Sequence, residues 1–230
     1  MRSPHTGQAQ GQPLQTSMET KHILQKLIDR QHLLPTETEA LFSSVLDGNF
    51  DPVQIAAIFT ALRMKGETSE EILGCIHAMR RHMITVNADG AIDVCGTGGD
   101  GKHTFNISTA VSFVVAACGV PVAKHGNRAA SSKSGAADVL EALGVNIILT
   151  PEQAEKVFKK IGIIFLFART YHPAMKHIAG IRQSLGIRTV FNILGPFSNP
   201  ASVKRQLIGV PDKKVARTLA TTAAQLAYER

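Results

Sequence analysis

Residues 93–109, DVCGTGGDGKHTFNIST, begin with a glycine-rich turn that follows a short apolar stretch. Glycine has no β-carbon, so its backbone can adopt left-handed conformations and bring N–H groups against a ligand. The spacing matches neither the G-x-x-x-x-G-K-[ST] nor the G-x-G-x-x-G pattern of common nucleotide loops. The chemistry that such a turn supports is the binding of an anion by backbone amides. The glycines are Gly96, Gly98, Gly99 and Gly101.

The same segment ends in hydroxyl and amide side chains, just before an apolar stretch that predicts a buried helix over 109–118. Asn106, Ser108 and Thr109 therefore lie at a helix start, where N–H groups lack partners within the helix. The positive end of the helix dipole also favours an anion there. A strand, a glycine turn and a helix start in this order indicate a phosphate-binding site.

A second cluster follows the next apolar stretch and mixes cations, hydroxyls and an amide. This mixture suits charge-assisted hydrogen bonds to phosphate oxygens. Gly126 and Gly135 supply flexibility on either side. The cluster consists of Lys124, His125, Asn127, Arg128, Ser131, Ser132, Lys133 and Ser134.

A third cluster, residues 180–200, contains Arg182 and Arg188 beside a turn-rich stretch. The arginine guanidinium is shaped to bind a carboxylate through two parallel hydrogen bonds. Taken by itself, each arginine is more often part of a structural ion pair.

The composition helps to decide between nucleic acid and a small molecule as the binding partner. The chain has 230 residues, a net charge of +7, 5% aromatic residues and no tryptophan. Scarce aromatics disfavour a surface that stacks nucleic-acid bases, so we expect a small anionic substrate and no nucleic acid. The longest apolar runs are too short to span a membrane. Cys75, Cys95 and Cys118 are far apart, which predicts reduced thiols in a cytoplasmic protein.

The first part of the chain is expected to be helical. Residues 1–17 have the composition of a disordered tail, and the folded chain is expected to begin at Met18. Residues 18–87 predict a helical domain of four short helices for packing or dimerisation. The residues that predict where these helices begin and end are Pro35, Thr36 with Glu39, Gly48, Asp51-Pro52, Gly66, and Thr68 with Glu71.

From residue 88 onward, short apolar strands alternate with helices, which predicts a mainly parallel sheet with sites at the carboxyl ends of its strands. The expected fold is α/β, with a small N-terminal α-helical domain. Residues 88–169 and 187–230 would form the α/β domain, and a helical stretch, 170–186, would pack on the helical domain. The expected strands are 91–95, 120–124, 146–149, 163–167 and 187–192, and the expected helices are 109–118, 135–143, 151–161, 171–185 and 213–230.

Taken together, the motifs resemble the anthranilate phosphoribosyltransferase family. The resemblance covers residues 20–230, and it depends on the order and spacing of motifs that are each weak alone. They are GTGGD at 96–100, NIST at 106–109, KHGNRAASS at 124–132 and GIRQSLGIRTVFNILGP at 180–196.

The resemblance implies a fold of the nucleoside phosphorylase and phosphoribosyltransferase type, in which residues 88–169 and 187–230 form the domain that binds the phosphoribosyl donor. It also implies an enzyme of tryptophan biosynthesis that joins the amine of anthranilate to C1 of 5-phosphoribosyl 1-diphosphate and releases diphosphate. It implies Mg²⁺, with Ser108 as a ligand, and a homodimer. Arg182 would orient anthranilate, Asn127 would touch it, and His125 would be at most an auxiliary base. The residues implied to bind the donor are Gly96, Gly99, Asp100, Thr104, Asn106, Ile107, Ser108, Thr109, Lys124, His125, Gly126, Asn127, Arg128, Ala129, Ala130, Ser131 and Ser132.

Two departures from the family pattern stand out. Ala136 replaces a serine of several members, which removes one hydroxyl contact. The chain also ends at Arg230, before the family's acidic Asp-Glu segment for a second magnesium ion. We therefore expect a truncated form with an exposed apolar sheet edge, poor solubility and little or no turnover.

Two other functions stay open at this point. A pyrimidine nucleoside phosphorylase shares the fold and a similar glycine loop, and a non-catalytic relative could use the positive charge to bind nucleic acid. The KHGNRAASS and GIRQSLGIRT motifs favour the anthranilate enzyme over both.

Overall fold

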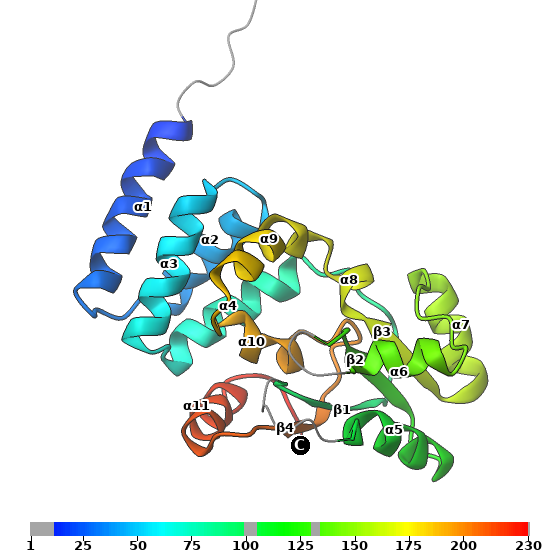
Figure 1. Ribbon diagram of the computed structural model, residues 1–230. Helices are drawn as coiled ribbons and strands as arrows, with labels where there is room; N and C mark the ends of the chain where they lie inside the picture. The colour runs from blue at the N-terminus through cyan, green and yellow to red at the C-terminus, as the bar shows by residue number, and fades with distance from the viewer. Residues whose placement is uncertain (1–11, 99–104, 130–133, 230) are drawn as a thin grey trace, which may run out of the picture.

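The computed structural model describes residues 12–98, 105–129 and 134–229. Helices form one layer, and a sheet with its own covering helices forms the other (Figure 1). Among the described residues, every helix is too short or too polar to cross a bilayer. Six of the predicted donor-binding residues lie outside the described residues: Gly99, Asp100, Thr104, Ala130, Ser131 and Ser132.

The N-terminal helices form a bundle around an apolar core. Helix α1 begins six residues before Met18, so residues 12–17, which we expected in the tail, are helical. Phe42 and Phe59 stack at the centre of the core, with 6.0 Å between ring centroids. The helices are α1 (Gln12–Ile28), α2 (Pro35–Leu46), α3 (Pro52–Lys65) and α4 (Ser69–Arg81).

Two of the predicted helix starts are confirmed. The Asp51 side chain accepts a hydrogen bond from the Val53 N–H at 2.8 Å, and Thr68 and Glu71 form a reciprocal capping box. The expected capping box of Thr36 with Glu39 is wrong. Helix α2 begins at Pro35, and the Leu34 N–H donates to Glu37 at 2.9 Å instead. Proline at the first helical position moves the start forward because it needs no N–H partner there.

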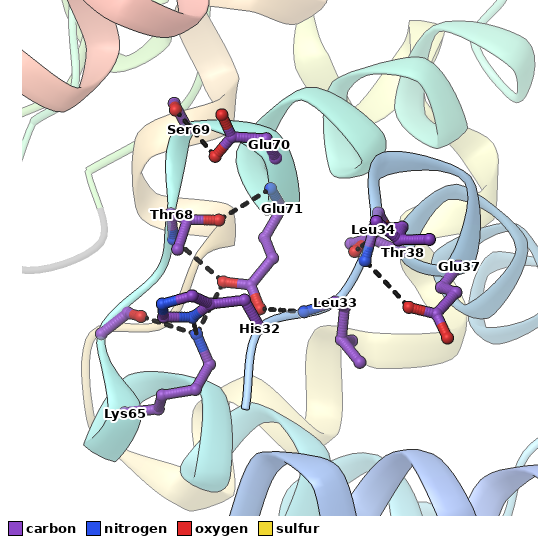
Figure 2. A network of polar contacts seen from close by, with 11 residues as sticks. His32, Leu33, Leu34, Glu37, Thr38, Lys65, Thr68, Ser69, Glu70 and Glu71 are labelled. Atoms are coloured by element: carbon purple, nitrogen blue, oxygen red, sulfur yellow. Dashed lines mark hydrogen bonds and ion pairs between the residues drawn. The ribbon is translucent and has the colours of Figure 1, made fainter. Parts of the chain in front are cut away.

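A buried ion pair ties three segments of the bundle together (Figure 2). The Lys65 ammonium lies 2.8 Å from the Glu71 carboxylate, and both side chains are almost fully buried. Glu71 also accepts the N–H groups of Leu33 at 3.0 Å and Thr68 at 2.9 Å. The carboxylate thus connects the α1–α2 loop, the end of α3 and the start of α4.

The sheet has four parallel strands in the order β3-β2-β1-β4. In its register Ile92 pairs with Val122 and Arg205, and Val122 pairs with Ile163. The carboxyl ends of β1 and β2 therefore share one edge of the sheet, which is where both glycine-containing loops leave it. The strands are β1 (Ile92–Gly96), β2 (Val122–Gly126), β3 (Ile163–Phe167) and β4 (Arg205–Gly209).

Helices and a short 3₁₀ turn cover the sheet. Leu140 of α6 joins a core with Phe165 and Phe167, whereas Ala154 of α7 and Tyr171 of α8 join a second core with residues of β2 and β3. The covering elements are α5 (Ile107–Ala117), α6 (Ala136–Ala142), α7 (Pro151–Ile161), α8 (Ala168–Tyr171) and η1 (Pro173–Met175).

The expected strands at 146–149 and 187–192 are wrong. The Ile148 N–H donates to the Asn146 side chain, and the Tyr171 hydroxyl donates to the Leu149 carbonyl, so side chains replace a strand partner. The Thr189 N–H is likewise taken by the Asn192 side chain at 2.9 Å. Local side-chain bonds of this kind compete with strand pairing.

The later part of the chain packs against the bundle. Phe191 lies 5.5 Å from Phe42 and 5.2 Å from Phe59 between ring centroids, so α10 completes the helical core. Residues 187–230 thus belong to both layers, whereas we expected them in the α/β domain alone. The predicted 213–230 helix ends at Ala223. The elements are α9 (Lys176–Leu185), α10 (Phe191–Leu194), η2 (Gly195–Ser198) and α11 (Lys213–Ala223).

Helix α5 differs from the buried helix that its sequence predicts. Only Thr109 and Ser112 of this helix are buried, while Val114 is 63% exposed. Leu207 on strand β4 is 67% exposed. Leu207 is thus an exposed apolar side chain on an edge strand of the sheet, as expected, whereas the exposed side chains of α5 belong to a helix that packs on β1 and β2.

Replacing Glu71 by Gln should lower the free energy of unfolding by about 3 kcal/mol, because the Lys65 ammonium would stay buried without a counter-charge. Urea unfolding at neutral pH, followed by far-UV circular dichroism, measures this change. The matched control is Glu70→Gln one position earlier, where the side chain is exposed, and its expected effect is below about 0.5 kcal/mol. Equal losses in the two variants would contradict the assignment.

Candidate functional site

The first loop leaves the sheet at the end of β1. Gly98 has a φ of +67°, in the left-handed region that glycine adopts without strain. A β-carbon on Gly96 would lie 3.2 Å from the Gly209 carbonyl oxygen, so glycine lets β4 approach closely. The Thr97 N–H donates to the same oxygen at 3.0 Å. The loop base is thus held by the neighbouring strand.

After residue 98, the described structure resumes at Phe105, just before α5. Asn106 occupies the N-cap position, and its side-chain oxygen accepts from the Thr109 hydroxyl at 2.7 Å instead of capping a backbone N–H. The first N–H groups of α5 therefore receive no cap from Asn106. Ile107 is 58% exposed and Ser108 is half-buried at this end. This arrangement fits the predicted anion site.

The second loop, from Asn127 to Gly135, is closed by one carboxylate. Asp138 of α6 accepts the Ala129 N–H at 2.9 Å and the Gly135 N–H at 2.8 Å, and these bonds lower its pKa. A β-carbon on Gly135 would lie 2.3 Å from the Ala129 nitrogen. Only glycine allows the two ends of the loop to meet so closely.

Arg128 is engaged within this loop. Its guanidinium pairs with Asp138 at 3.2 Å and with both oxygens of Glu141, and it lies over the ring of Phe167. The predicted phosphate contact of Arg128 would have to compete with these two carboxylates. The side-chain oxygen of Asn127 accepts a hydrogen bond from the backbone N–H of Arg128 at 2.8 Å.

Lys124 is not displayed at the loop. Its side chain is buried, and its ammonium donates to the Val94 carbonyl at 2.8 Å. Burial lowers the pKa of Lys124, and the charge of Asp93 opposes this shift. Lys124 also lines an apolar cavity of about 340 Å³ together with Phe113 and Phe165. Direct contact with a phosphate would require the ammonium to leave Val94.

His125 lies on the other face of β2, in contact with a second imidazole. Its Nδ1 is 3.0 Å from the Gly195 carbonyl, and its ring centroid is 5.1 Å from that of His172. Burial and the neighbouring His172 lower the pKa of His125 to about 3, and burial lowers that of His172 to about 4. His125 is therefore neutral near pH 7, and its buried Nε2 has no partner among the described residues.

Arg182 comes from α9, in the helical layer. Its guanidinium lies over the Phe191 ring, 5.5 Å from the centroid, and burial lowers its pKa. Within the described parts of the chain, no carboxylate forms an ion pair with it. A partly buried guanidinium in this state suits a carboxylate ligand.

The described residues offer few ligands for a metal ion. They contain no group of three or more His, Cys, Asp or Glu side chains that could hold one. The Ser108 hydroxyl is a hard oxygen ligand of the kind that Mg²⁺ accepts, and Mg²⁺ commonly takes most of its other ligands from substrate phosphates and water. The residues fit a metal ion that is carried by a phosphorylated ligand.

Sequence reasoning missed four side chains that organise this region. Asp138 closes the second loop. Asp93, Asn199 and Gln206 form a polar cluster near the amino-terminal ends of β1 and β4. A polar residue at the second position of an otherwise apolar strand was the available signal for Asp93. For Asp138 the available signal was its place three residues after Gly135, at the start of a predicted helix. Asn199 and Gln206 act across long sequence separations, so no local pattern revealed them.

The chain matches known families over both layers. Residues 21–83 match the helical bundle domain, and residues 88–230 the a/b domain, of a glycosyl transferase family. The chain is 53% identical to an anthranilate phosphoribosyltransferase of Caulobacter vibrioides over 211 residues, which cover 91% of this chain and 62% of that relative.

Solved structures of anthranilate phosphoribosyltransferases are also similar to this chain. A crystal structure of anthranilate phosphoribosyltransferase from Thermus thermophilus has a TM-score of 0.84 at 41% identity, covering 90% of this chain and 63% of that one. The Saccharomyces cerevisiae enzyme, in complex with PRPP and Mg, has a TM-score of 0.82 at 31% identity, with coverages of 92% and 63%.

The chain thus spans a little over three fifths of the length of these relatives. The resemblance predicted from the four motifs is confirmed, as are the parallel sheet and the helical domain. With both of its domains matched, the chain belongs to this glycosyl transferase family.

Proposed function

We propose that this chain forms the donor-binding part of an anthranilate phosphoribosyltransferase. The reaction transfers the phosphoribosyl group of 5-phosphoribosyl 1-diphosphate to the amine of anthranilate, in tryptophan biosynthesis. The amine nitrogen bonds to C1, the bond from C1 to the diphosphate oxygen breaks, and the amine loses a proton. The products are N-(5-phosphoribosyl)anthranilate and diphosphate.

One observation carries this proposal: the two glycine-containing loops leave adjacent parallel strands at the same sheet edge. Backbone N–H groups from the start of α5 would then face a polyphosphate bound between the loops. The N–H groups of Arg128 and Ala129 already donate to Asn127 and Asp138, so the second loop would shape the site without offering these two amides. Amides fixed by the fold stabilise charge that develops on a leaving group. Because Arg128 is paired and Lys124 is buried, amides would supply much of the recognition.

The proposed roles of the remaining side chains follow from their surroundings. Ser108 would hold the Mg²⁺ that enters with the donor, and this ion would neutralise charge on the diphosphate. Arg182 would bind the carboxylate of anthranilate. His125 would be at most an auxiliary base: its Nε2 has no partner among the described residues, but burial and the neighbouring His172 hold its pKa at about 3 and so weaken it as a proton acceptor. An arylamine is already nucleophilic, so positioning would supply most of the rate.

We further propose a cytoplasmic homodimer that forms through the helical domain. Support comes from exposed apolar side chains on that domain: Ile28, Leu34, Val53 and Met64 are each at least 60% exposed. The three cysteines are free thiols, in keeping with a reducing compartment. Light scattering coupled to gel filtration tests the dimer.

Titration calorimetry should show that the chain binds 5-phosphoribosyl 1-diphosphate in the presence of Mg²⁺. We expect the heat to be lost when the chelator EDTA is added, because Mg²⁺ would be needed to neutralise the phosphates of the donor next to Ser108. Ribose 5-phosphate, which lacks the diphosphate, is the control ligand and should bind at least about tenfold more weakly. No heat with the complete donor would refute the proposal.

Arg182→Met should weaken anthranilate binding by about 30-fold, the loss expected for a charge-assisted bidentate pair. Donor binding should stay within about twofold, since Arg182 is assigned to the acceptor. Arg169→Met, at an exposed position on α8, is the matched control. An equal effect of Arg182→Met on both ligands would contradict its role.

A pyrimidine nucleoside phosphorylase stays the second candidate because it shares the fold. The two are separated by substrate: phosphate-dependent cleavage of thymidine in the absence of anthranilate binding would favour the phosphorylase.

A further inference from the structure

Asp93 is a fully buried carboxylate whose partners come from three separate parts of the chain. It accepts the His125 backbone N–H at 3.2 Å, the Asn199 amide at 2.8 Å and the Gln206 amide at 3.0 Å. All of these groups are donors, so both carboxylate oxygens serve as acceptors. An asparagine at this position would turn an N–H toward at least one donor.

Two of these partners also hold the segment that contains η2. Asn199 follows η2 and donates to the Ala123 carbonyl at 2.8 Å as well as to Asp93. Gln206 donates to the Pro196 carbonyl at 2.6 Å. His125 adds its contact with the Gly195 carbonyl. The segment 195–199 is therefore hydrogen-bonded to residues of β1, β2 and β4.

The other side of the same segment belongs to the helical layer. Leu194 and Phe197 lie in the core of the bundle, and Arg80 of α4 donates to the Phe197 carbonyl at 2.8 Å. Figure 1 shows α10 and the turn after it between α4 and the sheet. The segment thus joins the layer that carries Arg182 to the strands that carry both loops.

We propose that Asp93 is a positioning residue that, through Asn199 and Gln206, fixes the 195–199 segment on the sheet and sets the helical layer relative to the donor loops. Asp93 contacts no loop ligand itself, because it lies near the start of β1 and is covered by the segment. Its effect on the reaction would be to align donor and acceptor, a role that rests on the proposed function.

The placement of the layers can be measured without any ligand. Nitroxide labels on the exposed native Cys118, directly after α5, and on Ala40→Cys, an exposed position of α2 that is not among the side chains proposed for the dimer, report the distance between the layers by pulsed dipolar spectroscopy. Dilution of the labelled chain into an excess of unlabelled chain restricts the measured distances to those within one copy. In the parent chain we expect one narrow distance distribution. Asp93→Asn and Gln206→Met should each broaden it or add a second distance.

The control is Gln153→Met, the same change at the start of α7, where the side chain accepts only the Thr150 N–H. It should leave the distribution unchanged. If Asp93→Asn does not unfold cooperatively, Gln206→Met decides, because it keeps the bond between Asp93 and Asn199. Distributions that superimpose on the parent, even with lowered stability, would overturn the proposal.

Binding gives a second readout that a purely structural role would not move. Gln206→Met should weaken anthranilate binding about tenfold when donor and Mg²⁺ are present, and less than about twofold without them, because alignment matters only when both ligands are bound. If the parent chain fails to bind donor, the proposed function fails while the label distances still judge the positioning role. Equal weakening with and without donor would count against it.

Discussion

The constraint on which the rest of this structure depends is the buried carboxylate of Asp93. A charge without access to water must be surrounded by hydrogen-bond donors. Here the donors come from a neighbouring strand, from the residue after η2 and from β4. Satisfying one side chain therefore fixes the packing of segments that lie more than 100 residues apart in the sequence, as the contacts of Asp93 with Asn199 and Gln206 show.

The helical layer uses the same principle at Glu71. This carboxylate is also buried, and its partners Lys65, Leu33 and Thr68 belong to three segments. Asp138 differs because it is partly exposed, and it closes one local loop instead of joining distant elements. Burial decides between these two uses, since a solvated carboxylate can exchange its protein donors for water.

The charges around the candidate site are arranged in a way that net charge does not suggest. The chain carries +7, yet Arg128 is neutralised by acidic neighbours and Lys124 is buried against a carbonyl. Among the described residues, the groups left open at this edge of the sheet are amides at the start of α5 and the Ser108 hydroxyl. Amides cost no proton and are held by the fold, so they suit a polyphosphate that brings its own metal ion.

The sequence by itself determined the family, the α/β class, the position of both loops and most helix starts, because these depend on short-range patterns. Glycine at 98, proline at 52 and the pair of Thr68 with Glu71 act within a few residues, and each is confirmed. The tertiary structure alone decided that 187–192 is no strand, that β4 pairs with β1, and that Phe191 completes the helical core. It also decided that Lys124 is buried and that Asp93 is the centre of a network. These features depend on contacts across long separations, where the burial of an aromatic ring or a charge outweighs local propensity.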